Sequence, residues 1–412
     1  MQLGRPVFFK RLGAPGAEAF AVLFALESFA RALLATVIPI EALRFLGTAG
    51  NVSSAFFAAS LCALCASLGI PWLVRKTARR WVYSLGFVGL ASAPALFTVP
   101  GFESFMAGMV VRAIGTVAVT VCLSLYILDF IAKKDLSRSE PMRLFYSAAA
   151  WAAGPFLGVW LAVNVGRDAP FLLSAAVALA ALGYFWFLRI TENPAVVQKA
   201  VPVPTPLAYV RRYFAQPRLR LAWVMTTGRN VWWVVFFIYV PVYAVKTGLG
   251  PEVGGAVVSV GASFLFLTPL TGRLVRREGI RRVFVAGYLL ASVATFLVAA
   301  SMGQPWIGIV LIVCAALGMS AIDAGGNMLF LFAVRRHERS EMTTVYSTYR
   351  DVADIVPPGL FSVLLRVFEL PAVFVVGGAV TLGLALLARR IHPRLGREAR
   401  PPAPLAVGEP AQ

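Results

Sequence analysis

The chain has 412 residues, of which 59% are hydrophobic and 14% are charged, and its mean hydropathy is +0.78. Soluble domains carry about 45–50% apolar and about 25% charged residues, so this composition excludes an ordinary soluble protein and indicates an integral membrane protein. A net charge of +19 would favour nucleic acid as the partner of a soluble chain, but 30 of the 38 Lys and Arg residues fall in alternate loops and the tails. This alternation favours a lipid bilayer, and we expect no nucleic-acid partner.

Apolar runs long enough to cross a membrane begin close to the N-terminus. A helix needs roughly 20 apolar residues to span a hydrocarbon core of about 30 Å. The first run is too long for a signal-peptide core and lacks a small-residue cleavage site, so we expect it to be retained. Six helices are expected in the first half, at residues 17–40, 51–74, 81–99, 104–131, 144–165 and 171–190.

A Pro-rich, non-periodic segment at residues 191–218 is typical of a linker. Six further helices are expected after it, at residues 219–245, 253–272, 283–302, 307–334, 344–367 and 371–388. The predicted organisation is a six-helix half over 1–190, a cytoplasmic linker over 191–218, a second six-helix half over 219–390 and a disordered cytoplasmic tail over 391–412.

The second half repeats the first with an offset of 200 to 203 residues, which matches Pro39 with Pro241, Gly115 with Gly318, and Tyr146 with Tyr346. Two six-helix repeats in parallel orientation imply a pseudo-two-fold axis along the membrane normal and a central cavity between the halves. Because cytoplasmic loops retain Lys and Arg, the basic loops place both termini in the cytoplasm. We expect a multi-pass protein of a bacterial-type inner membrane.

The most specific motif is the basic loop at residues 272–282, GRLVRREGIRR, which has a degenerate copy at residues 71–80. It resembles the loop that follows helices 2 and 8 in the major facilitator superfamily. The matching residues are Gly272, Leu274, Arg277, Gly279, Arg281 and Arg282 in the second copy, and Leu73, Lys76, Arg79 and Arg80 in the first. Both copies depart from the family pattern at one position, where Arg75 and Arg276 replace an aspartate that helps to latch the cytoplasmic side.

This resemblance implies an all-α fold of twelve transmembrane helices that works as a monomeric secondary transporter of a small molecule. Arg112 with Gly115 resembles a helix-4 motif of proton-coupled members, and Gly154-Pro155-x-x-Gly158 resembles a helix-5 motif of drug and proton antiporters. The resemblance therefore implies proton-coupled export of a small organic solute. A proton-linked carrier of an organic anion is the alternative, and a membrane sensor that transports nothing is a remote one.

An enzyme is a poor fit to this sequence. The two histidines, His337 and His392, lie in predicted cytoplasmic segments, and neither a metal cluster nor a nucleotide-binding loop is present. Cys62 and Cys65 lie within an apolar run with no histidine nearby, so packing explains them better than metal binding or redox chemistry. We expect no cofactor and no metal.

Charged residues inside the predicted helices are the candidates for function, because an ionised group at mid-bilayer costs at least about 2.5–3.5 kcal/mol. Proton coupling is assigned to the acids Glu27, Asp323, Asp351 and Asp354. Substrate binding or charge pairing is assigned to Arg31, Arg112, Arg229 and Arg350. The structural alternative is that these groups form fixed salt bridges between helices.

Spacing predicts specific pairs among these charges. Glu27 and Arg31 share one helix face, as do Arg350 and Asp354, because residues four apart are neighbours on a helix. Glu27 and Arg229 each lie ten residues, or about 15 Å, into their helices. They are therefore expected at the same depth, and we predict a bond between them across the centre.

Two other groups leave alternatives open. Trp233 and the other aromatic residues of the helix expected at 219–245, with Trp151 of the helix expected at 144–165, suit an apolar or aromatic solute, or else form lipid-facing or packing surface. In the segment Asp323-Ala-Gly-Gly-Asn327, Asp323 and Asn327 share a face, and the glycines serve either to bend the helix toward a cavity or to permit tight packing.

Because Arg75 and Arg276 replace the family aspartate, a cytoplasmic latch needs acids elsewhere. Asp129, Asp135 or Glu140 are candidates for Arg75, and Glu338 or Glu341 for Arg276. We predict such a charge-swapped latch, with binding of anionic lipid headgroups as the alternative. The predicted gate motif also includes Arg79 and Arg80.

Overall fold

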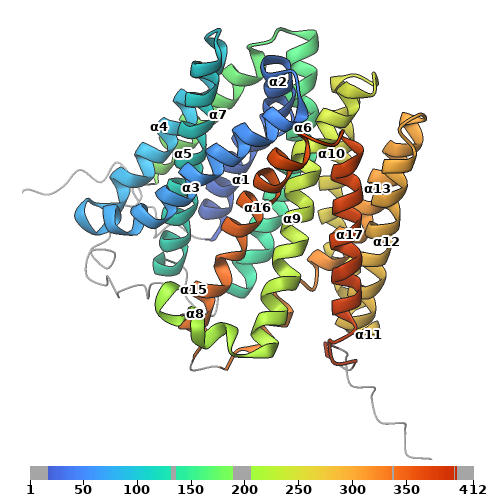
Figure 1. The fold of residues 1–412 in the computed structure, drawn as a ribbon. Helices are drawn as coiled ribbons and strands as arrows, with labels where there is room; N and C mark the ends of the chain where they lie inside the picture. Colours follow the sequence, from blue (N-terminus) through green and yellow to red (C-terminus); the bar gives the residue numbers. More distant parts are fainter. Residues whose placement is uncertain (1–16, 131–135, 189–205, 336–337, 394, 397–412) are drawn as a thin grey trace, which may run out of the picture.

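The computed structural model describes residues 17–130, 136–188, 206–335, 338–393 and 395–396, and within these residues every regular element is a helix (Figure 1). Eleven helical segments of the described chain are long and apolar enough to cross a membrane. This confirms the all-α membrane fold predicted from composition.

The N-terminal half begins with a broken first span and continues with five longer helices. Its helices are α1 (Ala17–Leu33), α2 (Val37–Leu46), α3 (Ala49–Lys76), α4 (Arg79–Thr98), α5 (Phe102–Phe130), α6 (Leu136–Asn164) and α7 (Ala169–Phe187).

The C-terminal half has more interruptions. Its helices are α9 (Pro217–Lys246), α10 (Pro251–Ser263), the 3-10 turn η3 (Phe264–Leu267), α11 (Thr268–Glu278), α12 (Ile280–Ala300), α13 (Pro305–Asp323), α14 (Met328–Ala333), α15 (Arg339–Ser347), α16 (Tyr349–Leu364) and α17 (Pro371–Ala388).

The expected eleventh helix, residues 344–367, is the span that differs most from the prediction. It is divided at Thr348 into α15 and α16, and it is not among the eleven apolar segments. The sixteen-residue α16 carries Arg350, Asp351 and Asp354 near its start, so its composition is too polar for an ordinary lipid-spanning helix. A segment of this kind is expected where a helix borders protein rather than lipid.

The ends of the predicted linker and the predicted tail contain ordered structure. A nine-residue helix, α8 (Pro206–Phe214), lies within the linker, and its Tyr213 is fully buried. The Pro-rich part up to residue 205 lies outside the described residues. In the tail, Ile391 is buried and the amide of Ile280 donates a hydrogen bond to the carbonyl of Leu395.

The two halves repeat the same packing. In the first half α4 packs against α5 and α7, and in the second half α12 packs against α13 and α17. A Cβ on Gly115 of α5 would lie 2.8 Å from the carbonyl oxygen of Gly86, and one on Gly318 of α13 would lie 2.8 Å from that of Gly287. The glycines matched in sequence therefore make the same close helix contact in both halves.

The break between α1 and α2 coincides with glycines of α6. A Cβ on Gly158 would lie 1.8 Å from the carbonyl oxygen of Leu33, and one on Gly154 would lie 2.5 Å from the Cβ of Ala32. Glycine is therefore required at both positions for α6 to reach the end of α1. The Gly-Pro-x-x-Gly motif thus has a packing role here.

The halves contact each other mainly through α3 with α16 and α6 with α10. Hydrogen bonds between them, among the described residues, lie toward the end of the bundle that carries α2, at the top of Figure 1. The four bonds join Ser53 with Tyr239 at 2.6 Å, the Phe156 amide with Ser259 at 2.9 Å, Asn164 with Glu252 at 2.9 Å, and Lys246 with the Gly47 carbonyl at 3.1 Å. We call this the joined end, and the opposite end, which carries α8, α11 and α15, the basic end.

Candidate functional site

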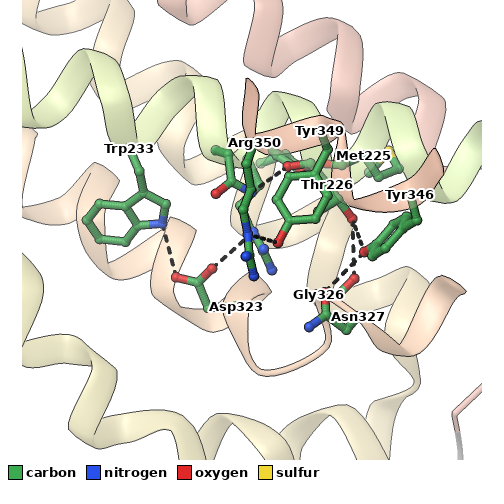
Figure 2. A network of polar contacts seen from close by, with 12 residues as sticks. Met225, Thr226, Trp233, Asp323, Gly326, Asn327, Tyr346, Tyr349 and Arg350 are labelled. Atoms are coloured by element: carbon green, nitrogen blue, oxygen red, sulfur yellow. Dashed lines mark hydrogen bonds and ion pairs between the residues drawn. The ribbon is translucent and has the colours of Figure 1, made fainter. Parts of the chain in front are cut away.

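An ion pair lies at the centre of the C-terminal half. The Nε of Arg229 on α9 lies 3.1 Å from Oδ1 of Asp323, at the end of α13, and the indole of Trp233 donates a hydrogen bond of 3.0 Å to Oδ2 (Figure 2). The two charged side chains are only 10% and 17% exposed. Both carboxylate oxygens of Asp323 therefore have a partner, which an ionised group away from water requires.

The turn after Asp323 is shaped around this arginine. The helix predicted over 307–334 breaks between α13 and α14, and the carbonyls of Ile322 and Asp323 accept hydrogen bonds from the amides of Gly325 and Gly326. A Cβ on Gly326 would lie 1.5 Å from Nη1 of Arg229. Bending and close packing were alternative explanations for these glycines, and the structure contains both.

Tyrosine and threonine side chains extend the network beside Arg229. The hydroxyls of Thr226 and Tyr346 lie 2.9 Å apart, and Tyr346 donates to Oδ1 of Asn327 at 3.1 Å. Tyr288 donates to the carbonyl of Met225 at 2.8 Å. These bonds tie α9 to α12, α14 and α15, so the Arg229–Asp323 pair is held on several sides.

The N-terminal half contains its own pair. Oε1 of Glu27, which is fully buried, lies 3.1 Å from Nη2 of Arg31 and accepts a hydrogen bond of 3.4 Å from Thr120 on α5. Arg112, also on α5, donates one hydrogen bond of 3.4 Å to the carbonyl of Arg31. The i, i+4 pairing of Glu27 with Arg31 is confirmed.

The predicted bond between Glu27 and Arg229 is wrong, because each residue pairs within its own half. The reason lies in the sequence repeat: Thr120 and Asp323 differ by 203 positions, and Glu27 and Arg229 by 202. Each first-helix charge therefore meets the equivalent helix of the same half, α5 or α13. Equal depth was a poor guide, because it does not say which side of a helix faces the partner half.

The polar start of α16 faces the other half. Arg350 donates to the hydroxyl of Tyr349 at 3.1 Å, and the predicted pair of Arg350 with Asp354 does not form an ion pair. Asp354 is exposed, and its helix α16 packs against α3 of the N-terminal half. Asp354 therefore borders the space between the halves.

The aromatic residues of α9 are mostly packing groups. Trp232 and Phe236 are buried and stack at 5.3 Å, which excludes them from a lipid-facing surface. Trp233 binds Asp323, as described above. Trp151 of α6 lies 5.0 Å from Phe237 of α9, so this ring contact joins the two halves.

The predicted gate motif lies at the basic end. Gly279, at φ +89°, ends α11 and begins α12, a conformation that favours glycine. Gly272 is buried, Arg276 and Arg277 are exposed, and Arg282 pairs with Glu278 at 2.8 Å. In the first copy, Arg79 lies over the ring of Tyr126 and Arg80 over that of Trp81.

The acids predicted to serve Arg276 have another partner. Glu338, which is buried, and Glu341 both pair with Arg212 of the linker helix α8, the latter at 3.4 Å. Both acids therefore contact the linker helix, and their pairing with Arg276 stays a prediction. The side chains of Arg75, Asp129, Asp135 and Glu140 lie outside the described residues, so the other half of the latch stays a prediction.

The Arg212 contact changes the protonation of Glu338. Burial alone would raise its pKa, but the hydrogen bond and the charge of Arg212 outweigh burial and hold the pKa of Glu338 below its usual value. A lowered pKa in the folded protein stabilises it above the ordinary glutamate pKa. This stabilisation is lost as the pH falls through the lowered value.

We expect Arg212→Ala to lower the unfolding temperature at pH 7, because it removes the hydrogen bond and the charge that Arg212 supplies to Glu338. The difference from the wild type should narrow between pH 7 and pH 3, because the stabilisation that Arg212 gives is lost below the ordinary glutamate pKa of 4.5. Arg211→Ala is the control, since Arg211 is exposed and has no ion pair among the described residues. A difference in unfolding temperature between Arg212→Ala and the wild type that is equal at both pH values would contradict this role.

Two surface hollows lie elsewhere and contain none of the candidate residues. One lies at the turn between α12 and α13, and the other beside the start of α17. Their position at the periphery of the bundle separates them from the charged groups.

The fold is that of a multi-pass helical membrane protein with ion pairs inside each half. The sequence matches the family model of the Major Facilitator Superfamily over residues 20–358, with a second match over 251–409. The chain therefore belongs to this superfamily of secondary transporters. A search of curated proteins finds no match.

Solved transporters share the fold at low sequence identity. A structure of the nucleoside transporter NupG matches with a TM-score of 0.69 and 15% identity, covering 90% of this chain and 98% of that one. The peptide transporter POT in complex with sulfate matches with a TM-score of 0.72 and 14% identity, over 94% and 96%. A POT family transporter in complex with 5-aminolevulinic acid matches with a TM-score of 0.72 and 13% identity, over 92% and 96%.

Sequence reasoning missed the uncharged partners in these networks. Thr120, Thr226, Tyr346 and Tyr288 carry no charge, so hydropathy did not mark them. The repeat offers a signal for two of them: Thr120 is the counterpart of Asp323, and Tyr346 is the counterpart of Tyr146.

Proposed function

We propose that this protein is a proton-coupled secondary transporter that exports a small organic solute by alternating access. The observation that carries the proposal is the difference between its acids. Glu27 and Asp323 each pair with an arginine, whereas Asp354, on the polar start of α16, has no hydrogen bond or ion pair with any described residue. A carboxylate that borders the space between the halves without a fixed partner is suited to exchange a proton.

Asp351 strengthens this assignment. It lies one turn from Asp354 and likewise has no ion-pair partner among the described residues. Two neighbouring carboxylates repel each other when both are ionised, so a shared proton relieves the repulsion. A cationic solute would relieve it equally well, and solute and proton would then compete for one site, which is the requirement for exchange in opposite directions.

The four hydrogen bonds at the joined end support alternating access. They are few, and three of the four join side chains to side chains or to the backbone near helix ends. Such contacts can separate without unfolding either half, because each half has its own packed helices. Rocking of the halves would then expose Asp354 to the opposite side of the membrane.

A second function, transport of an organic anion with protons, is favoured by Arg112. This guanidinium makes only one long hydrogen bond, and the nearest charge acting on it is Arg31, which has the same sign. Arginine binds carboxylate or phosphate through paired hydrogen bonds. When the acids on α16 are protonated, the charge of Arg112 would give the space between the halves a net positive charge.

The test begins with a ligand screen of the purified protein by thermal stabilisation, comparing lipophilic cations with organic anions, because binding raises the apparent stability. The best ligand is then followed in proteoliposomes. Wild-type protein should move it against its gradient when a proton gradient is imposed. Asp354→Asn should lose the response to the proton gradient, and any solute exchange that remains should be independent of that gradient.

Asp323→Asn is the comparison variant, since the same charge is removed from an acid already paired with arginine. An unchanged proton response in Asp354→Asn would reject Asp354 as the carrier. Absence of any flux in the wild type would favour the sensor alternative.

We also propose the division into residues 1–190, 191–218, 219–390 and 391–412, with α8 assigned to the linker. Placement in a bacterial-type inner membrane, cytoplasmic termini and a monomeric state belong to the same proposal. The basic residues of the loops support this orientation.

A further inference from the structure

The two halves present opposite surplus charge to each other. In the N-terminal half, Glu27 neutralises Arg31, and Arg112 remains as an additional positive charge. On α16 of the C-terminal half, one arginine accompanies two acids, which leaves one negative charge. Because Arg229 and Asp323 neutralise each other, the surplus charges are the ones left to interact with a ligand.

The positive side has unused hydrogen-bond donors. A guanidinium has five N–H groups, but Arg112 uses one, in a bond of 3.4 Å to a carbonyl. The buried Nε of Arg31 has no hydrogen-bond partner. Two arginines with free donors, lying side by side, form a site for a carboxylate or a similar anion.

The negative side has unused acceptors. Neither Asp351 nor Asp354 accepts a hydrogen bond from any described residue, and Arg350 directs its Nε to Tyr349 instead. The helix α16 packs against α3 of the N-terminal half, and the described side chains of Arg31 and Asp354 form no ion pair with each other. Asp354 and the donors that Arg31 does not use for Glu27 are therefore available to a charged group placed between the halves.

We propose that the space between the halves binds a zwitterion, with its acid group on Arg31 and Arg112 and its ammonium group on Asp351 and Asp354. This inference rests on the proposed transport function and names its class of solute. An anion alone would leave the two acids repelling each other, and a cation alone would leave Arg112 without a counter-charge. A zwitterion satisfies both sides at once and keeps the bound state neutral.

Aromatic side chains add a preference to this class. Trp151 and Phe237 touch across the halves at 5.0 Å, and Trp233 lies 6.0 Å from Phe237. These rings offer an apolar surface between the halves for a side chain of the solute. An aromatic amino acid or a short aromatic peptide has both the charges and the apolar group.

The experiment measures binding of L-phenylalanine and of the dipeptide phenylalanyl-phenylalanine to the purified wild-type protein by calorimetry. Each ligand is compared with its C-terminal amide, which is a cation, and its N-acetyl form, which is an anion. We expect each cap to weaken binding of the preferred zwitterion at least tenfold, or about 1.4 kcal/mol.

Two variants assign the ends of the ligand. Arg112→Gln should weaken the zwitterion and the N-acetyl form but leave the amide unchanged. Asp354→Asn should weaken the zwitterion and the amide but leave the N-acetyl form unchanged. Arg366→Gln is the control, because Arg366 is exposed near the joined end. This variant should bind all forms of the ligand like the wild type.

The proposal is overturned if neither zwitterion binds better than its capped forms, or if Arg112→Gln weakens all forms equally, as a purely structural residue would. Failure of the proposed proton-coupled transport can be distinguished from failure of the zwitterion site. A zwitterion preference without proton-driven flux would retain this binding site and reject proton coupling. Proton-driven flux of a singly charged ligand would retain the function and reject the zwitterion.

Discussion

Replacing Arg229 by methionine should destabilise the protein by about 3–5 kcal/mol, the range observed when one partner of a buried ion pair is removed. Methionine fills much of the same volume, so the expected loss arises from the charge left on Asp323. That carboxylate is 17% exposed and would retain only the Trp233 hydrogen bond. Unfolding in mixed detergent with increasing dodecyl sulfate measures the change.

The double variant Arg229→Met with Asp323→Asn separates charge from packing. Asparagine keeps an oxygen that can accept from the Trp233 indole, and no buried charge remains. Most of the lost stability should therefore return. A double variant as unstable as Arg229→Met alone would show that Arg229 contributes through packing around Gly326 rather than through its charge.

A disulfide across the joined end should stop transport completely and reversibly. A Cβ placed on Gly50 of α3 would lie 3.4 Å from the Cβ of Leu365, just after α16. This is close to the separation found in disulfides, about 3.5–4.5 Å. Gly50→Cys with Leu365→Cys, in a background where the four native cysteines are alanine, should therefore cross-link the two halves on oxidation.

In proteoliposomes, the oxidised double variant should show no more solute flux than protein-free liposomes, and reduction should restore the flux. Each single variant, treated with the same oxidant, controls for damage by oxidation. Undiminished flux in the fully cross-linked protein would mean that the joined end does not open during transport.

The sequence was a good guide to the features that repeat along the chain. Apolar runs and basic loops predicted the helical spans, and the matched glycines Gly115 and Gly318 make equivalent contacts in the two halves. Hydropathy depends on local composition, so it identifies a helix reliably. It was less informative for α16, where Arg350, Asp351 and Asp354 make the start of a helix polar.

Contacts between distant elements were harder to predict. Glu27 pairs with Arg31, as helical spacing predicts, but the partner of Arg229 is Asp323, nearly a hundred residues away. The depth of a residue along its helix can be counted from the sequence. The rotation of that helix about its axis and the identity of its neighbours depend instead on the packing of the whole half. The pairing of Arg212 with Glu338 depends on a short helix inside a Pro-rich linker, which composition alone did not indicate.

Proton movement coupled to solute movement is the most direct test of the function proposed here. Proteoliposomes with wild-type protein and an internal pH-sensitive dye are loaded with the best-stabilising solute and diluted into solute-free buffer of equal pH. An exporter that exchanges solute for protons should acidify the interior as solute leaves, and Asp354→Asn should not. Solute efflux without a pH change in the wild type would contradict proton-coupled export.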